Sequence, residues 1–256
     1  MIGDTLSNIL FYAPLAVWLF STFFFYYRYD KEYKVSFSEK YYKKRVTEDP
    51  AAVVSYLIDH KGIGPKDAYA TAIDLMQAGR LSFDGGFHVA GEGTDGLLPH
   101  QASLLEKLLS GAGGDPDFMT GWIFLVKQDA KEFNYYEPQS FVKKMGLLGS
   151  IFYTAIGVVG ILIARELRFF VLFIISVITF FHMRKIDKRT REAQADFERC
   201  MALKRFLSDY DGSEELEAGV LPFAYSMGIL PGGNERLQEK CQCYQDALER
   251  VDIIIN

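Results

Sequence analysis

The sequence predicts a mainly α-helical membrane protein with three transmembrane helices, an N-terminal anchor followed by a hairpin, and α-rich soluble lobes. Two observations predict this fold class: three long stretches of apolar residues, and Lys and Arg residues that gather beside them. The composition of the 256 residues, 49% apolar and 24% charged with a mean hydropathy of +0.03, averages over these unlike parts. It excludes collagen-like, disulfide-scaffold and wholly disordered chains.

The first apolar stretch, residues 8–27, reads NILFYAPLAVWLFSTFFFYY and contains no charged residue. As an α-helix it is about 30 Å long, the thickness of the hydrocarbon layer, and Pro14 is tolerated near the start of a membrane helix. A cleaved signal peptide would need a positively charged segment before the stretch, where this chain has Asp4. We therefore expect a transmembrane anchor that is retained.

The second and third stretches, residues 145–164 and 169–183, predict a membrane hairpin with Arg165-Glu166-Leu167-Arg168 as its turn. The third stretch is only about 22 Å long as a helix, so it must include Leu167 and let Arg168 snorkel, or thin the bilayer. A buried core helix is the alternative for so short a run. The adjoining span and the charged turn favour the hairpin.

Small residues recur at four-residue spacing in the second span: Gly146, Ser150 and Thr154, and separately Gly160 and Ala164. This spacing suits close packing against another helix. No acidic residue lies within any of the three predicted spans, which argues against a proton- or cation-coupled carrier.

The basic residues predict the orientation of the spans. Fourteen Lys and Arg flank the spans on one side, whereas the opposite side has only Arg165 and Arg168. The positive-inside rule then places the amino terminus outside and residues 28–144 and 184–256 in the cytoplasm. We expect a multi-pass protein of the bacterial inner (cytoplasmic) membrane.

The first lobe, residues 28–144, has the element order of a winged helix. Residues 51–60 predict a helix with one apolar face, Pro65 opens a second helix over residues 66–78, and Gly79 suits its C-terminal end. The stretch LSF-DGG-FHVA, residues 81–90, then reads as a tight β hairpin, the wing.

This winged-helix-like module is not expected to bind nucleic acid. Its second helix carries Lys66 against Asp67 and Asp74, within residues 47–142 that hold six basic and fourteen acidic residues. Phosphate contacts need Lys and Arg on the helix that enters the groove. A winged module that contacts protein is the better hypothesis.

The rest of the first lobe predicts one more helix and one strand. Residues 97–109 carry inward-facing leucines at helical spacing and end at a glycine-rich loop, residues 111–117. The following MTGWIFLVK, residues 119–127, is apolar and β-prone.

The second lobe, residues 184–256, is expected to continue the third span as a helix over residues 187–210, broken at Asp211-Gly212-Ser213. Asn234 is a suitable N-cap for a final helix. That helix has one apolar stripe, typical of a core or partner-helix face: Leu237, Cys241, Tyr244, Leu248 and Val251.

The residues offer no catalytic, cofactor-binding or metal site, and we expect no enzyme activity. Cys241 and Cys243 stand without a second thiol pair or a His nearby, and the third cysteine is Cys200. His182, at the inner end of the third span, fits an interfacial residue better than a membrane pathway. The remaining histidines are scattered along the chain: His60, His88 and His100.

Three stretches together resemble the YciQ-like predicted bacterial membrane proteins, a domain family of unknown function. They are DPAAVVSYLIDHKGIGPKDAYATAIDLMQAGRLSF, the membrane hairpin, and Leu221-Pro222-Phe223-Ala224-Tyr225-Ser226-Met227-Gly228-Ile229, preceded by Lys204-Arg205-Phe206-Leu207-Ser208. The resemblance covers roughly residues 8–230 and implies no reaction, cofactor or catalytic residue. Family members usually begin with a signal peptide and a large extracytoplasmic β-rich domain, whereas about seven residues precede the first span here, so we expect that domain to be missing.

The function that the sequence favours is a scaffold or adaptor in the membrane, whose acidic cytoplasmic lobes bind a protein partner or a second copy of the chain. One alternative is a small oligomeric transport or channel subunit, with the second and third spans lining a path. A membrane-tethered transcription regulator is the other alternative.

Overall fold

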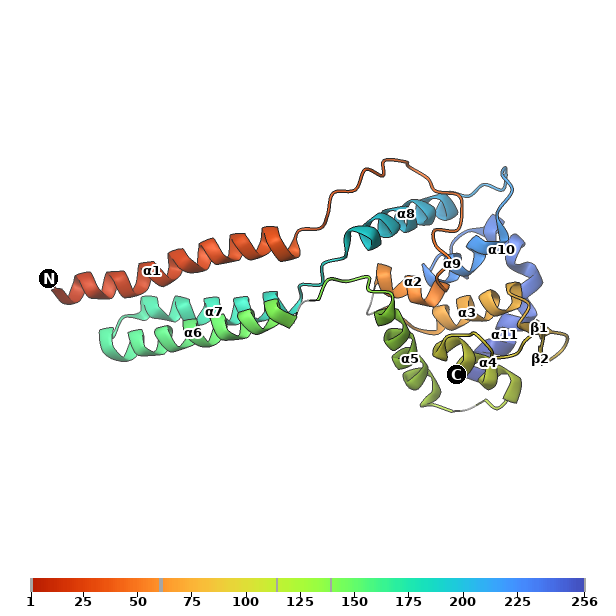
Figure 1. Cartoon of the computed structure of the whole chain (residues 1–256), viewed down its shortest axis with the longest axis horizontal. Helices are drawn as coiled ribbons and strands as arrows, with labels where there is room; N and C mark the ends of the chain where they lie inside the picture. Colours follow the sequence, from red (N-terminus) through yellow and green to blue (C-terminus); the bar gives the residue numbers. More distant parts are fainter. Residues whose placement is uncertain (1, 60–61, 114, 139, 256) are drawn as a thin grey trace. The chain divides into compact units, whose positions relative to one another are not determined.

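The computed structural model describes residues 2–59, 62–113, 115–138 and 140–255, and it divides the chain into two compact units. Unit 1 consists of residues 1–34 and 136–190, and unit 2 consists of residues 35–135 and 191–256. Each unit is therefore built from two separate stretches of chain (Figure 1).

Unit 1 contains three long apolar helices, as the sequence predicts. Each is long and apolar enough to cross a membrane, over Ser7–Asp30, Phe141–Ile163 and Leu167–Arg184. The third includes Leu167, as its length requires. The helices are α1 (Ile2–Phe25, continued by a π-helical turn at Tyr26–Asp30), α6 (Ser140–Ala164) and α7 (Phe170–Arg184, preceded by a 3₁₀ turn at Leu167–Phe169).

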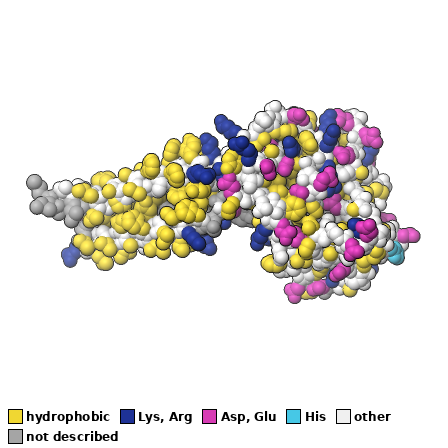
Figure 2. All heavy atoms as spheres, viewed as in Figure 1, with side chains coloured by type: hydrophobic (Ala, Val, Ile, Leu, Met, Phe, Trp, Pro, Cys, Tyr) yellow, Lys and Arg dark blue, Asp and Glu magenta, His cyan; other side chains and the backbone are white. Residues whose placement is uncertain are grey.

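The surface of these three helices is mostly apolar. Large side chains such as Phe20 and Leu167 are 74% and 86% exposed, and hydrophobic side chains cover the visible faces of the helices (Figure 2). In water, so large an apolar surface would cause the protein to aggregate. Lipid chains are as apolar as these side chains and can surround them. The surface therefore fits a bilayer as its solvent.

Helices α6 and α7 pack closely because glycines face the neighbouring helix. A Cβ atom on Gly160 would lie 2.1 Å from Cδ1 of Phe169, and one on Gly146 would lie 2.3 Å from Cβ of Met183. Thr154 donates a hydrogen bond to Ser176 across the same face, over 2.9 Å. The predicted small-residue face is confirmed for these positions, and Gly157, which the four-residue spacing missed, also packs against α7.

Hydrogen bonds tie α1 to the hairpin near its turn and along its length. Arg168 donates to Asn8 and Ser7, and Ser7 donates to Glu166, which also pairs with Arg168. Trp18 donates to Thr179 over 2.8 Å. The Arg168 guanidinium thus has partners within the protein.

At the other end of unit 1, the segments that leave the three helices bind one another. Lys188 is 4% exposed, with its ammonium over the ring of Tyr33 and 3.2 Å from the carbonyl oxygen of Arg28. Arg189 pairs with Glu32 at 3.1 Å, and the backbone N–H of Glu137 donates to Lys188.

These contacts lie where the sequence predicts that the third span continues into the next helix. That prediction is wrong: α7 ends at Arg184, and α8 (Arg191–Ser208) begins only after an extended stretch. The backbone of this stretch pairs with the chain around Tyr136 instead of closing helical turns.

Unit 2 replaces the two expected lobes with a single body. Its elements are α2 (Ala51–Ile58), α3 (Pro65–Gln77), β1 (Leu81–Phe83), β2 (Phe87–Val89), α4 (Pro99–Ser110), α5 (Phe118–Glu132), α8, α9 (Leu221–Ser226), α10 (Glu235–Cys241) and α11 (Gln245–Ile255). The first six come from the chain before the membrane hairpin and the others from the chain after it.

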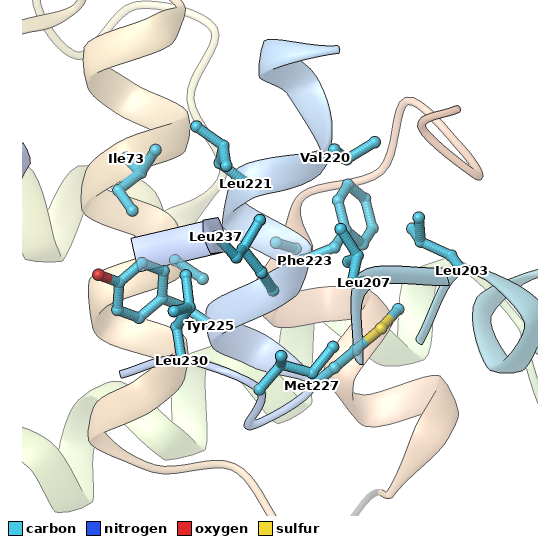
Figure 3. Close-up of a cluster of buried hydrophobic side chains, with 14 of the residues drawn as sticks. Ile73, Leu203, Leu207, Val220, Leu221, Phe223, Tyr225, Met227, Leu230 and Leu237 are labelled. Carbon is cyan, nitrogen blue, oxygen red and sulfur yellow. The ribbon is translucent and has the colours of Figure 1, made fainter. Parts of the chain in front are cut away.

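One hydrophobic core joins the two stretches of unit 2. Ile73 of α3 lies in the same buried cluster as Leu203 and Leu207 of α8 and Phe223 of α9 (Figure 3). Phe223 is fully buried. The buried side chains of this cluster thus come from both stretches, the larger part of them from residues 191–256.

A second core has the same mixed origin. Leu104 and Leu108 of α4 and Trp122 of α5 pack with Val251 and Ile254 of α11. The last helix of the chain therefore completes the hydrophobic core of the first lobe.

The order helix, helix, hairpin is present as predicted, with β1 and β2 antiparallel in the register Leu81↔Val89. Gly79 ends α3 with a φ of +66°, a conformation that favours glycine. The expected first helix is present, with Val53, Val54 and Leu57 buried, and the remaining sides of α2 are largely buried as well. His60, which was included in that helix, lies outside the described residues.

The strand expected at residues 119–127 is also wrong, because this stretch belongs to helix α5. Trp122, Val126 and Ala130 recur every four residues, and all three are buried. Burial of this helical stripe outweighs the weak β propensity of the individual residues.

Candidate functional site

An open groove of about 350 Å³ on unit 2 is the candidate site. Elements from both stretches of the unit line it, so that residues far apart in the sequence share one wall. The residues that define it here are Tyr69 of α3, Tyr225 of α9, Gln238 and Cys241 of α10, and Leu248 and Asp252 of α11.

Asn234 fixes the turn that positions α10 beside α9. Its side-chain oxygen accepts from the N–H of Leu237 over 3.2 Å, which confirms the predicted N-cap. Its amide group donates to the carbonyl oxygens of Leu207 and Tyr210, at the end of α8. Gly233 is required beside it, because a Cβ atom there would lie 2.5 Å from the carbonyl oxygen of Ile229.

Two tyrosines form the aromatic wall of the groove. The rings of Tyr69 and Tyr225 meet edge to face with their centroids 6.2 Å apart, and the Tyr69 hydroxyl donates to Asp252. Burial and the hydrogen bond to Asp252 raise the pKa of Tyr69, and burial raises that of Tyr225. Both tyrosines are therefore neutral hydroxyls at physiological pH.

The cysteines near the groove are protonated thiols. Burial raises the pKa of Cys241 to about 12 and that of Cys200, deeper in the core, also to about 12. A thiol in this state is a weak nucleophile and a poor metal ligand. Cys243, the partner of Cys241 in the short motif, is exposed.

The groove combines an apolar surface with a rim of polar and acidic side chains. Leu248 and the tyrosine rings offer an apolar surface, and glutamine amides and the carboxylates of Glu249 and Asp252 surround it. Gln245 already donates to Glu249 over 3.2 Å. Such a rim attracts Lys or Arg and keeps out acidic groups.

A buried His–Asp pair lies elsewhere in unit 2. His100 is fully buried, its Nδ1 is 2.6 Å from Oδ2 of Asp129, and its backbone N–H donates to the same oxygen over 3.0 Å. Trp122 donates to the carbonyl oxygen of His100 over 2.9 Å. The pair joins α4 to α5 inside the core, so its role is to hold these helices together.

The acidic residues on α3 also have structural partners. Asp74 accepts from the backbone N–H of Ala51 over 2.9 Å and thereby caps the first turn of α2, and Arg45 lies 3.7 Å away. Asp67 accepts from the N–H of Gly64 over 2.9 Å at the start of α3. Burial raises the pKa of both carboxyl groups, that of Asp67 to about 6.

No site residue was predicted from the sequence. Only the predicted apolar stripe of the final helix includes residues that line the groove. Of the final apolar stripe, Cys241 and Leu248 reach the groove, whereas Leu237 and Val251 are in the core. The stripe itself is divided by a 3₁₀ turn at Gln242–Tyr244. His88 and His182 are exposed, and the described residues include no group of three or more His, Cys, Asp or Glu side chains that could hold a metal ion.

Comparison of the chain with protein-family models, with curated proteins and with solved structures finds no match to any of them. Function is therefore inferred from the geometry and charge of the chain itself.

Proposed function

We propose that this chain is a scaffold or adaptor of the bacterial cytoplasmic membrane, which holds unit 2 in the cytoplasm and there binds a protein partner through the groove beside Tyr225. The observation that carries the proposal is the groove itself, an aromatic and apolar surface with a carboxylate rim. The partner segment would present a basic side chain next to an apolar one.

The shared core of unit 2 supports the membrane topology. Residues 35–135 and 191–256 pack into one body, so both must lie on the same side of a membrane. Two crossings, by α6 and α7, separate them along the chain, and two crossings return the chain to the side it left. The positive-inside rule makes that side the cytoplasm.

The charges of the two units support a basic partner. Unit 2 has 17 Lys and Arg against 27 Asp and Glu, a net charge of −10, whereas unit 1 has 11 against 6, a net charge of +5. A strongly acidic body attracts basic segments and repels nucleic acid.

We further propose that α2, α3 and the hairpin form a winged-helix-like module that serves as the centre of unit 2. Every described residue from Lys66 to Gln77 is buried or half-buried, and Lys66 donates to the carbonyl oxygen of Ser226. A recognition helix must be exposed to enter a DNA groove. These observations favour the adaptor over a transcription regulator.

The test is a photo-crosslinking amino acid placed at Gln242, in the groove wall, in the full chain in its own membranes. The matched control carries the same amino acid at Glu106, which is exposed on α4. We expect one discrete adduct with a second protein from Gln242 and none from Glu106. The Glu249→Arg variant should weaken that adduct, because it reverses the charge of the rim.

Two outcomes contradict the proposal. The first is an adduct of the chain only with itself, which would favour an oligomeric assembly. The second is the same adducts from both positions, which would show that the groove has no selectivity.

A further inference from the structure

A second hollow, in unit 1, lies where the hairpin helices reach the basic end of the spans. It has a volume of about 640 Å³ and is lined by Lys143, Lys144 and Leu147 of α6 and Phe180 and Arg184 of α7. Gly146 packs directly on Met183 at this level, so the helices are close enough for basic side chains from both to line one hollow.

Two of its three cations have no acidic partner among the described residues. Lys143 lies 3.4 Å from Asp187. Lys144 is exposed, and Arg184 stacks over the ring of Phe180 with its guanidinium carbon 5.0 Å from the centroid. Uncompensated positive charges around one hollow attract an anion.

The floor of the hollow is apolar and continues into the membrane. Leu147 is 48% exposed, and Ile151, one helical turn further along α6, is 57% exposed. On α7, Val177 lies one turn from Phe180 on the membrane side and is 41% exposed. A ligand that fits both parts has an anionic head and apolar chains.

The level of the hollow matches that of lipid headgroups. Lys143 and Lys144 lie at the start of one membrane-spanning segment, Phe141–Ile163, and Arg184 ends another, Leu167–Arg184. The phosphates of a bilayer lie at these boundaries of its hydrocarbon layer.

We infer that this hollow binds an anionic diacyl phospholipid, with its phosphate between Lys144 and Arg184 and an acyl chain along Leu147, Ile151 and Val177. The inference shares with the proposed function only the insertion of unit 1 in a membrane. It assigns the hairpin a ligand of its own, independent of any protein partner of unit 2.

The test measures lipids retained by the full chain after reconstitution with phosphatidylglycerol or phosphatidylcholine and gentle solubilisation, by native mass spectrometry. We expect preferential retention of phosphatidylglycerol. The double variant Lys144→Gln/Arg184→Gln should lower its apparent affinity about 30-fold, since each such charge contributes about 1 kcal/mol.

A matched control removes two positive charges at the same end of unit 1 but outside the hollow, Lys31→Gln/Lys34→Gln, and should retain the lipid. A second variant, Leu147→Trp, keeps every charge and fills the floor, and it should weaken retention. Resistance to carbonate extraction shows for each variant that it has entered the membrane, which separates failure of this inference from failure of insertion.

Three results would overturn the inference. They are equal retention of the two lipids, an equal loss in the control variant, and complete displacement of the lipid by a millimolar excess of inorganic phosphate. The last would show an anion site with no preference for a lipid.

Discussion

Units 1 and 2 place their large apolar side chains in opposite positions. In unit 1, Phe20 is 74% exposed and Leu167 is 86% exposed, whereas in unit 2 Phe223 is fully buried and Trp122 is 1% exposed. Acidic side chains are few in unit 1, which has 6 Asp and Glu, whereas the 27 of unit 2 are spread widely over its surface (Figure 2). Each arrangement is stable only in its own solvent, hydrocarbon for unit 1 and water for unit 2.

The two units also hold their helices together by different means. In unit 2, burial of large side chains from distant stretches stabilises the fold, because water drives them together. Between α6 and α7, glycines allow close backbone approach, and hydroxyl pairs such as Thr154 with Ser176 add hydrogen bonds. Lipid supplies no hydrophobic force between helices, so packing and hydrogen bonds must suffice.

The largest expected effect on stability comes from a matched pair of substitutions, one in each unit. Phe223→Ala should destabilise unit 2 by about 3–5 kcal/mol, because it leaves a cavity in the core. Phe20→Ala removes the same atoms from a lipid-facing position and should leave the stability of unit 1 unchanged.

The two tryptophans report the units separately, since Trp18 lies in unit 1 and Trp122 in unit 2. Urea unfolding in detergent, followed by tryptophan fluorescence in single-tryptophan backgrounds, measures each effect. Equal losses from the two phenylalanine substitutions would contradict the assignment of different solvents.

The next effect is a pH dependence that belongs to unit 2. Asp67 has a pKa of about 6 in the folded chain, raised by burial from an ordinary value of 3.8. The folded state therefore binds this proton more tightly than the unfolded state, and stability is lost as the pH rises from about 4 to about 6. The loss is about 3 kcal/mol, since one pKa unit corresponds to about 1.4 kcal/mol.

Asp67→Asn removes this titration and retains an oxygen that can accept from the Gly64 N–H. The variant should gain stability relative to the wild type as the pH rises through this window, measured by urea unfolding with Trp122 as reporter. A difference between the two proteins that stays constant from about pH 4 to about pH 7 would contradict the expected titration.

A smaller effect tests the glycine packing of unit 1. Gly160→Ala places a methyl group 2.1 Å from the Phe169 ring and should cost about 1–3 kcal/mol by overpacking. The control is Gly149→Ala on the same helix, where a Cβ atom would meet nothing within 4 Å. Unfolding followed by Trp18 fluorescence should move only for the first variant, and an equal response from both would refute a specific packing face.

The smallest effect concerns one hydrogen bond of unit 1. Thr179→Val removes the acceptor of the Trp18 indole N–H, and hydrogen bonds between membrane helices contribute about 0.6 kcal/mol on average. Ile178→Val, at an exposed position of the same helix, is the control and should have no effect on Trp18-monitored unfolding. A loss of several kcal/mol from Thr179→Val would mean that this bond organises the whole bundle.

The sequence predicted unit 1 better than unit 2, and the reason is physical. A membrane span is a local property, because an uncharged run of sufficient length is enough to define it. All three spans, and the contact of Gly146 and Gly160 with the next helix, could therefore be predicted from local patterns.

The errors lie where a local pattern competes with distant contacts. Residues 119–127 look β-prone, yet Trp122 and Val126 are buried as part of a helical stripe that extends to Ala130. The third span was expected to continue as a helix, yet α7 ends at Arg184 and the backbone beyond it, at Lys188, accepts a hydrogen bond from Glu137.

The candidate groove lies beyond local prediction for the same reason. Its aromatic wall combines Tyr69 with Tyr225, and its carboxylate Asp252 lies still further from Tyr69 in the chain. Only the shared core of the two stretches of unit 2 brings these residues together. Neither stretch carries a sequence pattern that predicts its contact with the other.

The central claim is that two stretches of chain separated by a membrane hairpin form one body on one side of the membrane. Cysteine labelling tests it most directly. In a Cys243→Ser background, single cysteines are placed at Ser82 and Ser213, one in each stretch of unit 2, and at Leu167 in the hairpin turn; all three positions are exposed. With an impermeant maleimide, we predict labelling of Leu167→Cys in intact cells, and of Ser82→Cys and Ser213→Cys only after the membrane is opened. Labelling of Ser82→Cys and Ser213→Cys from opposite sides would contradict the shared core and the account built on it.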